Sequence, residues 1–185
     1  MAFTDYTSPA VDAVTGVVAP ASLWNTYVRD NGRVAAPHRI ALTTSDQTVN
    51  NSTTYVNVTG HGDPMALTVA ANEVWLLWWM ILWLSPSTPD IKFEWTFPTA
   101  GQVTADLAYL DAVNVVSHQN LSTTTSPAGD FTAAGSNNNK LLALPMHYVN
   151  GANAGTLQLR FAQFAANASN TIVRSNSTLW GVKLA

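Results

Sequence analysis

The side chains that could do chemistry are few and widely spaced in this sequence. The four histidines, His38, His61, His118 and His147, stand too far apart to have the spacing of metal ligands. His61-Gly62-Asp63 would place two ligand-type side chains on one turn, but such a tripeptide is more often an ordinary turn. The absence of cysteine excludes disulfides, thiolate nucleophiles and cysteine-based zinc sites. The sequence therefore predicts no metal and no cofactor.

Motifs of known enzymes are also absent. No nucleophile elbow, phosphate-binding loop or dinucleotide fingerprint occurs, and Ser, His and Asp show no triad-like arrangement. Asp106 and Asp111 flank one predicted strand end, and Asp90 and Glu94 flank another strand boundary. Paired carboxylates hydrolyse glycosides only when they face each other across a cleft, which sequence does not reveal. A hydrolase stays a third hypothesis, and we predict that the protein is not an enzyme.

The composition favours contact between protein surfaces. Apolar residues make up 47% of the 185 residues and charged residues only 10%, against about 25% charged residues in average soluble domains. The formal net charge of -3 leaves little repulsion between copies. The eight basic residues are scattered singly, so no stripe exists that would neutralise a phosphate backbone. We expect no nucleic acid partner.

Most of the chain has the pattern of short strands. From Arg39 onward, β-like segments alternate with Gly, Pro, Asn and Ser, a pattern typical of a β-sandwich or a β-barrel. Of the two, we expect an all-β fold with an antiparallel, jelly-roll-like β-sandwich over residues 38–185. Ile91–Phe97 alternates apolar and polar residues, so one face of that strand is expected to be wet. Trp180, Val182 and Leu184 form another apolar row. The predicted strands are Arg39–Thr43, Thr53–Thr59, Met65–Val69, Glu73–Leu84, Ile91–Phe97, Val103–Leu110, Leu141–Val149, Thr156–Phe164, Asn170–Arg174 and Thr178–Leu184.

The segment Val74–Leu84 is apolar at every position. It is too short for a membrane helix, which needs about 20 residues, and its aromatic and β-branched content favours a strand. No membrane partner is expected. A sandwich buries one face of each sheet, so the second face needs a cover. We predict a subunit interface at Trp75, Trp79 and Trp83, with the N-terminal helix or a long loop as the alternative cover.

Residues 1–37 differ from the rest and are predicted to form an attachment arm. Ser22 is a fitting N-cap and Asn31-Gly32 a fitting C-terminal stop for one short helix, which alone is marginal in water. Met1–Thr15 has no basic region, so we expect no signal peptide. The alternative is that Trp24 packs against its own domain. The predicted contacts of the arm are Leu23, Trp24, Tyr27 and Val28.

Ser117–Lys140 is rich in Ser, Thr, Asn, Gly and Ala and is predicted to be a long loop. A binding role and a solvated excursion both stay open for this loop. Exposed aromatic residues on a β-sandwich raise a second hypothesis, a module that binds carbohydrate or a receptor, because tryptophan faces stack on sugar rings.

Three groups of residues resemble a known family. The segment Ala21–Asn31, with Trp24-Asn25 and Val28-Arg29-Asp30-Asn31, resembles the W-N-x-x-V-R-D-N segment near the start of many tailed-bacteriophage virion proteins. Val49–Asn57, Val69–Asn72 and Asp90–Pro98 resemble the N-S-T-T, V-A-A-N and D-I-K-F pattern of phage structural domains with jelly-roll folds. The similarity covers residues 21–98.

The resemblance implies a virion structural protein made in the host cytoplasm. Such a protein would decorate the capsid or form a head fibre or tail fibre, commonly as a homotrimer. Its N-terminal arm would attach it to other virion proteins such as the major capsid protein, and a host surface glycan is a further possible partner. The family supplies no catalytic residues.

Overall fold

The computed structural model describes residues 10–11, 18–19, 38–60, 63–110 and 116–185. The chain divides into two compact units, Met1–Pro37 and His38–Ala185. In the first unit, β1 (Ala10–Val11) and β2 (Val18–Ala19) form an antiparallel pair. The predicted arm helix lies outside the described residues, so the attachment role of Leu23, Trp24, Tyr27 and Val28 stays a prediction.

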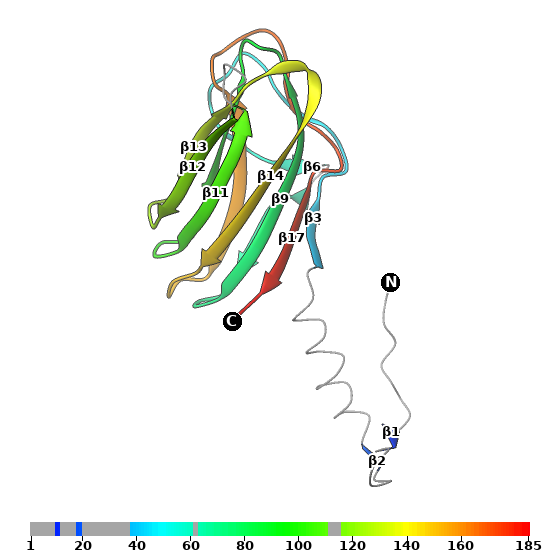
Figure 1. Cartoon of the computed structure of the whole chain (residues 1–185), viewed down its shortest axis with the longest axis vertical. Coiled ribbons are helices and arrows are strands. Elements are labelled where there is room, and N and C mark those ends of the chain that lie inside the picture. Colours follow the sequence, from blue (N-terminus) through cyan, green and yellow to red (C-terminus); the bar gives the residue numbers. More distant parts are fainter. Residues whose placement is uncertain (1–9, 12–17, 20–37, 61–62, 111–115) are drawn as a thin grey trace. The chain divides into compact units, whose positions relative to one another are not determined.

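The larger sheet of the second unit has eight strands (Figure 1). At its centre β9 (Val74–Ser85) pairs with β14 (Ser136–Val149) on one side. On the other side it pairs first with β17 (Thr178–Lys183) and then with β16 (Thr171–Val173). The sheet continues outward through β3 (His38–Leu42), β4 (Gln47–Val49), β11 (Gln102–Leu110) and β12 (Val116–Thr123).

The smaller sheet has five strands. Its strands are β13 (Ala128–Ala133), β10 (Ile91–Thr96), β15 (Gly155–Gln163), β5 (Val56–Asn57) and β8 (Ala66–Val69), with β5 and β8 both paired to β15. A separate short pair joins β6 (Thr59–Gly60) to β7 (Asp63–Pro64). All pairings are antiparallel, and the described residues contain no helix. The predicted all-β, antiparallel fold is confirmed, and each predicted strand segment overlaps an observed strand.

One hydrophobic core joins the two sheets. Trp79 of β9 and Trp95 of β10 come from different sheets, and their ring centroids lie 6.4 Å apart. Phe93, Phe131 and Phe161 of the smaller sheet are also fully buried. Each such side chain contributes roughly 1.5–3 kcal/mol through loss of apolar surface to water. The contact between the sheets is therefore held mainly by aromatic side chains.

The core face of β9 is the face that carries Trp75, Trp79 and Trp83. Their side chains are only 7%, 0% and 3% exposed, so the prediction that they form a subunit interface is wrong. The reason is strand register: Trp79 stands opposite Leu144 of β14 and Leu179 of β17, both fully buried. Opposite residues share a face of an antiparallel sheet. The face left over on β9 is the other one.

The predicted loop Ser117–Lys140 is also wrong. This segment contains most of β12, all of β13 and the start of β14. Its polar residues concealed the strands because many of them occupy exposed positions, whereas the buried positions are filled by few and small apolar residues. Phe131 is the large exception, and its ring lies 5.6 Å from that of Phe93.

The alternation in Ile91–Phe97 predicts a wet outward face for β10. The structure shows that this prediction is wrong. Glu94 is only 5% exposed, and its carboxylate lies 3.0 Å from the guanidinium of Arg160, which stands opposite it on β15. Lys92 and Arg160 both lie over the ring of Tyr55. This face is therefore covered by the ring of Tyr55, from the loop before β5, and carries the ion pair between Glu94 and Arg160.

Candidate assembly surface

The strand β9 turns a second row of apolar side chains away from the core. These side chains alternate with the buried ones and are all half-buried or exposed, Met80 being 39% exposed. In an average half-wet strand these positions hold polar residues. The row consists of Val74, Leu76, Trp78, Met80, Leu82 and Leu84.

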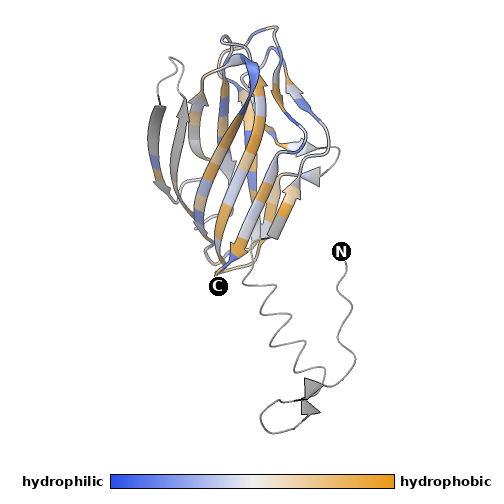
Figure 2. Ribbon diagram, turned by 45° about the vertical axis from the view of Figure 1, so that its right-hand side comes forward, coloured by the Kyte–Doolittle hydropathy of each residue, from blue (hydrophilic) through white to orange (hydrophobic). Residues whose placement is uncertain are grey.

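The neighbouring strands widen this row into a continuous apolar face. On β17, Trp180 stands opposite Trp78 and is 38% exposed. On β14, Leu141 stands opposite Leu82 and is 56% exposed. We call the outer apolar face the row on β9 together with Leu141, Ala143, Pro145 and Val149 of β14, Ile172 of β16, and Trp180, Val182 and the following Leu184. Hydrophobic positions run along the adjoining strands of this sheet in Figure 2.

Charge is excluded from this face. None of its members is charged, and the polar positions within it are His147, opposite Leu76, and Thr178, opposite Met80. Lys140 and Lys183 stand opposite the core residues Trp83 and Trp75. Their ammonium groups are engaged, with the carbonyl of Ala134 at 2.6 Å and with Glu73 at 2.8 Å. Two arginines lie at its border. The backbone of β3 places Arg39 opposite Trp180, and Arg174, whose backbone N–H donates to the Leu82 carbonyl, is paired with Asp46.

Sequence reasoning predicted that β9 carries a surplus apolar face but chose the wrong face for it. The row of Trp180, Val182 and Leu184 was the signal in the sequence that indicates the correct face. These residues stand next to the outward row of β9, and residues opposite each other on paired strands lie on the same face of the sheet. The arm residues lie outside the described part of the chain. Of the predicted interface residues, the described part of the chain contains Trp75, Trp79 and Trp83, and it buries all three. The structure adds Trp78, Met80, Leu141 and Trp180 as apolar residues of the outer surface.

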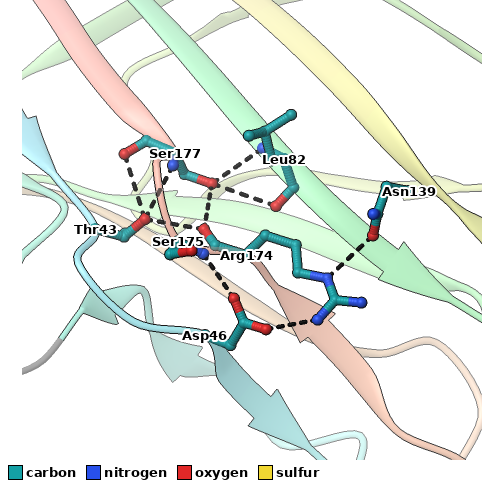
Figure 3. A network of polar contacts seen from close by, with 7 residues as sticks. All are labelled: Thr43, Asp46, Leu82, Asn139, Arg174, Ser175 and Ser177. Carbon is teal, nitrogen blue, oxygen red and sulfur yellow. Dashed lines mark hydrogen bonds and ion pairs between the residues drawn. The ribbon is translucent and has the colours of Figure 1, made fainter.

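A polar network closes one end of the larger sheet (Figure 3). The carboxylate of Asp46 accepts hydrogen bonds from the Ser175 N–H, at 2.8 Å, and from the guanidinium of Arg174, whose Nε also donates to Asn139 Oδ1 at 3.0 Å. The hydrogen bond from the Ser175 N–H, followed by that from Arg174, lowers the pKa of Asp46. The network links the segment before β4, the turn after β16 and strand β14.

The hydroxyls in the same network serve the backbone. Thr43 Oγ1 donates to the carbonyl of Arg174 at 2.9 Å and accepts from the Ser177 N–H at 3.0 Å. Ser177 Oγ accepts from the Leu82 N–H at 3.0 Å. The contacts drawn in Figure 3 join these side chains to the backbone of the turn and to one another, so they hold the turn in place.

Within residues 38–60, 63–110 and 116–185, no three His, Asp or Glu side chains cluster in a way that would hold a metal ion. No helix in the described part of the chain has the length and apolar character needed to cross a membrane.

Comparison with known proteins gives little guidance. No protein-family model and no curated protein matches the chain. Among solved structures, it matches the crystal structure of the VP2 subviral particle of infectious bursal disease virus with 8% identity and a TM-score of 0.21, covering 95% of this chain and 45% of that one. A structure of the Gt strain of the same virus matches with 8% identity and a TM-score of 0.21, covering 94% and 44%. The chain thus spans less than half the length of these structures, and a TM-score this low assigns neither fold nor function.

Proposed function

We propose that this protein is a structural component of a bacteriophage virion, without enzymatic activity, that decorates the capsid or forms part of a head fibre or tail fibre. The observation that carries the proposal is the outer apolar face. A charge-poor apolar surface at the centre of a sheet is what an assembling protein presents to its partners, whereas soluble monomers seldom leave such a surface open.

The strand order supports a jelly-roll-like β-sandwich for the second unit. The last strand, β17, lies between β3 and β9, and β14 follows on the far side of β9. In the other sheet, β8, β15, β10 and β13 are successive neighbours. Along β3, β8, β9, β10, β13, β14, β15 and β17, each strand lies in the other sheet from the one before it, except that β10 and β13 are neighbours in the smaller sheet. The β11–β12 hairpin of the larger sheet is inserted between these two. Two interlocked Greek keys of this kind make a jelly roll, a fold that capsid proteins use.

The proposed partners follow from the arm and from the outer face. Residues 1–37 attach the protein to another virion component such as the major capsid protein, through Leu23, Trp24, Tyr27 and Val28. The second unit associates with other copies of the chain. Nucleic acid, membrane and cofactor have no part in this function.

The direct test is the composition of purified phage particles. Mass spectrometry of particles from the source of the sequence should detect this chain at a copy number comparable to other structural proteins. Its absence from purified particles, with the protein present in the infected cell, would contradict the proposal.

The role of the arm has its own test. Trp24→Ala should reduce incorporation into particles strongly, because truncating an interface tryptophan commonly costs about 2 kcal/mol or more. The melting temperature of the free protein should hardly change. A large loss of thermal stability with normal incorporation would instead place Trp24 against its own domain.

A second candidate function is recognition of a host surface glycan. It is favoured by Trp78 and Trp180, which stand side by side on an uncharged sheet face where sugar rings stack well. Glycan-array binding that disappears in Trp180→Ala would support this function. The structural role is favoured when the wild-type protein binds no glycan and is present in particles.

A further inference from the structure

We infer that the outer apolar face binds the same face of a second copy of this chain. This inference rests on the proposed function, which requires association between copies, and it names the surface that associates. The face lies at the centre of the larger sheet and continues without interruption from β14 through β9 to β17 and β16. Its occupant must therefore be broad and apolar.

The size of the face fits a second copy. The strand β9 has 12 residues, which at ~3.4 Å per residue gives a length of about 40 Å, and three strands spaced ~4.8 Å apart give a width of roughly 14 Å. The face thus covers on the order of 500 Å² per copy. Two copies together bury about 1,000 Å², which reaches the lower limit for a specific interface.

The charge distribution fits the same occupant. A face that meets its own copy must carry no concentration of one sign, because like charges would be brought together and desolvated. The outer apolar face has no charged member, and the lysines of the same strands lie on the opposite side and are engaged.

The arrangement of the largest side chains also suits a like-on-like contact. Trp78 lies near the middle of β9, between Pro145 on β14 and Trp180 on β17. These three rings are stiff, so they lose little side-chain freedom on binding. Two sheets packed face to face stand about 10 Å apart, which allows such side chains to interdigitate. Pairing about a symmetry axis then repeats every contact in each copy.

The test uses the full chain and its mass in solution. Light scattering at micromolar concentration should give twice the 19.8 kDa chain mass, because a face that binds itself closes a dimer. Met80→Asp should shift the mass to that of one chain. The dissociation constant should rise at least about 30-fold, as expected for loss of a central interface residue. Phe164→Asp is the matched control, because Phe164 is an equally apolar exposed residue, 56% exposed, outside the face. It should leave the oligomer intact.

A second variant keeps the test independent of folding defects. Leu141→Asp changes a side chain that is 56% exposed and opposite Leu82, so it should dissociate the oligomer with an unchanged melting temperature of the monomer. A cysteine-free chain also allows single-cysteine labelling. Ala143→Cys should react with a maleimide at least about 10-fold more slowly in the oligomer than after dilution, whereas Thr156→Cys on β15 should react at one rate.

Several outcomes overturn the inference. A monomeric wild-type protein at micromolar concentration does so, as does an oligomer that survives both aspartate substitutions and leaves the cysteine at position 143 reactive. A monomer found in purified particles, and lost from them in Met80→Asp, would show that another virion protein occupies the face. That result would refute the like-on-like contact and keep the proposed function. Absence from particles would refute the proposed function instead.

Discussion

Gly129 of β13 is a position where the addition of a single methyl group should lower the free energy of unfolding strongly. Its φ of +83° is one that residues with a side chain rarely adopt. A Cβ added there would lie 2.6 Å from Cζ3 and 2.7 Å from Cε3 of Trp95, inside the contact distance of two carbon atoms. Trp95 is fully buried between the sheets and has no free space to move into.

The expected cost of Gly129→Ala is the sum of two separate effects. A positive φ costs an alanine roughly 1–2 kcal/mol, and overpacking of a filled core costs about 1–3 kcal/mol. We therefore expect a loss of about 2–5 kcal/mol in the free energy of unfolding. That is a large share of the ~5–15 kcal/mol by which domains are stable.

A double-mutant cycle separates the two effects. Trp95→Phe withdraws the outer ring of the indole and so relieves the collision, but it leaves the backbone strain at position 129 unchanged. In the Trp95→Phe background, Gly129→Ala should cost about 1–2 kcal/mol less than it does in the wild type, within the usual range of coupling between residues in contact. Urea unfolding followed by tryptophan fluorescence measures all four proteins. Thr132→Ala, at a half-buried position of the same strand, is the control and should cost less than about 1 kcal/mol.

The reasoning is refuted by a loss below about 1 kcal/mol for Gly129→Ala, because β13 would then not pass over Trp95 as described. Equal costs in the two backgrounds would refute only the collision. In that case backbone conformation alone requires glycine at position 129.

Three further predictions concern ionisable groups. Burial raises the pKa of Tyr148 to about 12 from a usual 10.0. This tyrosine therefore ionises first in the unfolded chain, and stability should fall as pH rises from 10 to 12. An ultraviolet titration in which every tyrosine ionises together near pH 10 would contradict this. The pKa of Asp46 is lowered from 3.8 by the Ser175 N–H and then Arg174, so its contribution is present above that pH and lost as pH falls through the lower folded value. Asp46→Asn should flatten the acid limb of the stability profile slightly, since the carboxylate is 41% exposed, and a steeper limb would show the sign to be wrong. Arg160→Met should lower the free energy of unfolding by about 3 kcal/mol, because it removes the guanidinium beside the buried Glu94 carboxylate. Lys92→Met is the control, and equal small losses in the two variants would argue against a buried ion pair.

The sequence determined the class of the fold and the existence of a surplus apolar surface. Turn residues between short β-branched and aromatic segments are enough to predict strands, because each strand needs only local alternation and each turn only local backbone freedom. An apolar residue at every position of Val74–Leu84 is enough to predict that one face of this strand exceeds what a single core can bury. The polar strands β12 and β13 escaped detection because their burial comes from neighbours distant in sequence.

Only the tertiary structure decided which face of β9 is inside. Both of its rows are apolar, so the period-two pattern fits either orientation equally well. The choice was made by β14 and β17, which place Leu144 and Leu179 opposite Trp79, and Pro145 and Trp180 opposite Trp78. Shifting the register by one residue would exchange the two faces completely. The partners of a strand, and not its own residues, therefore determined that Trp79 lies in the core and Trp78 on the surface.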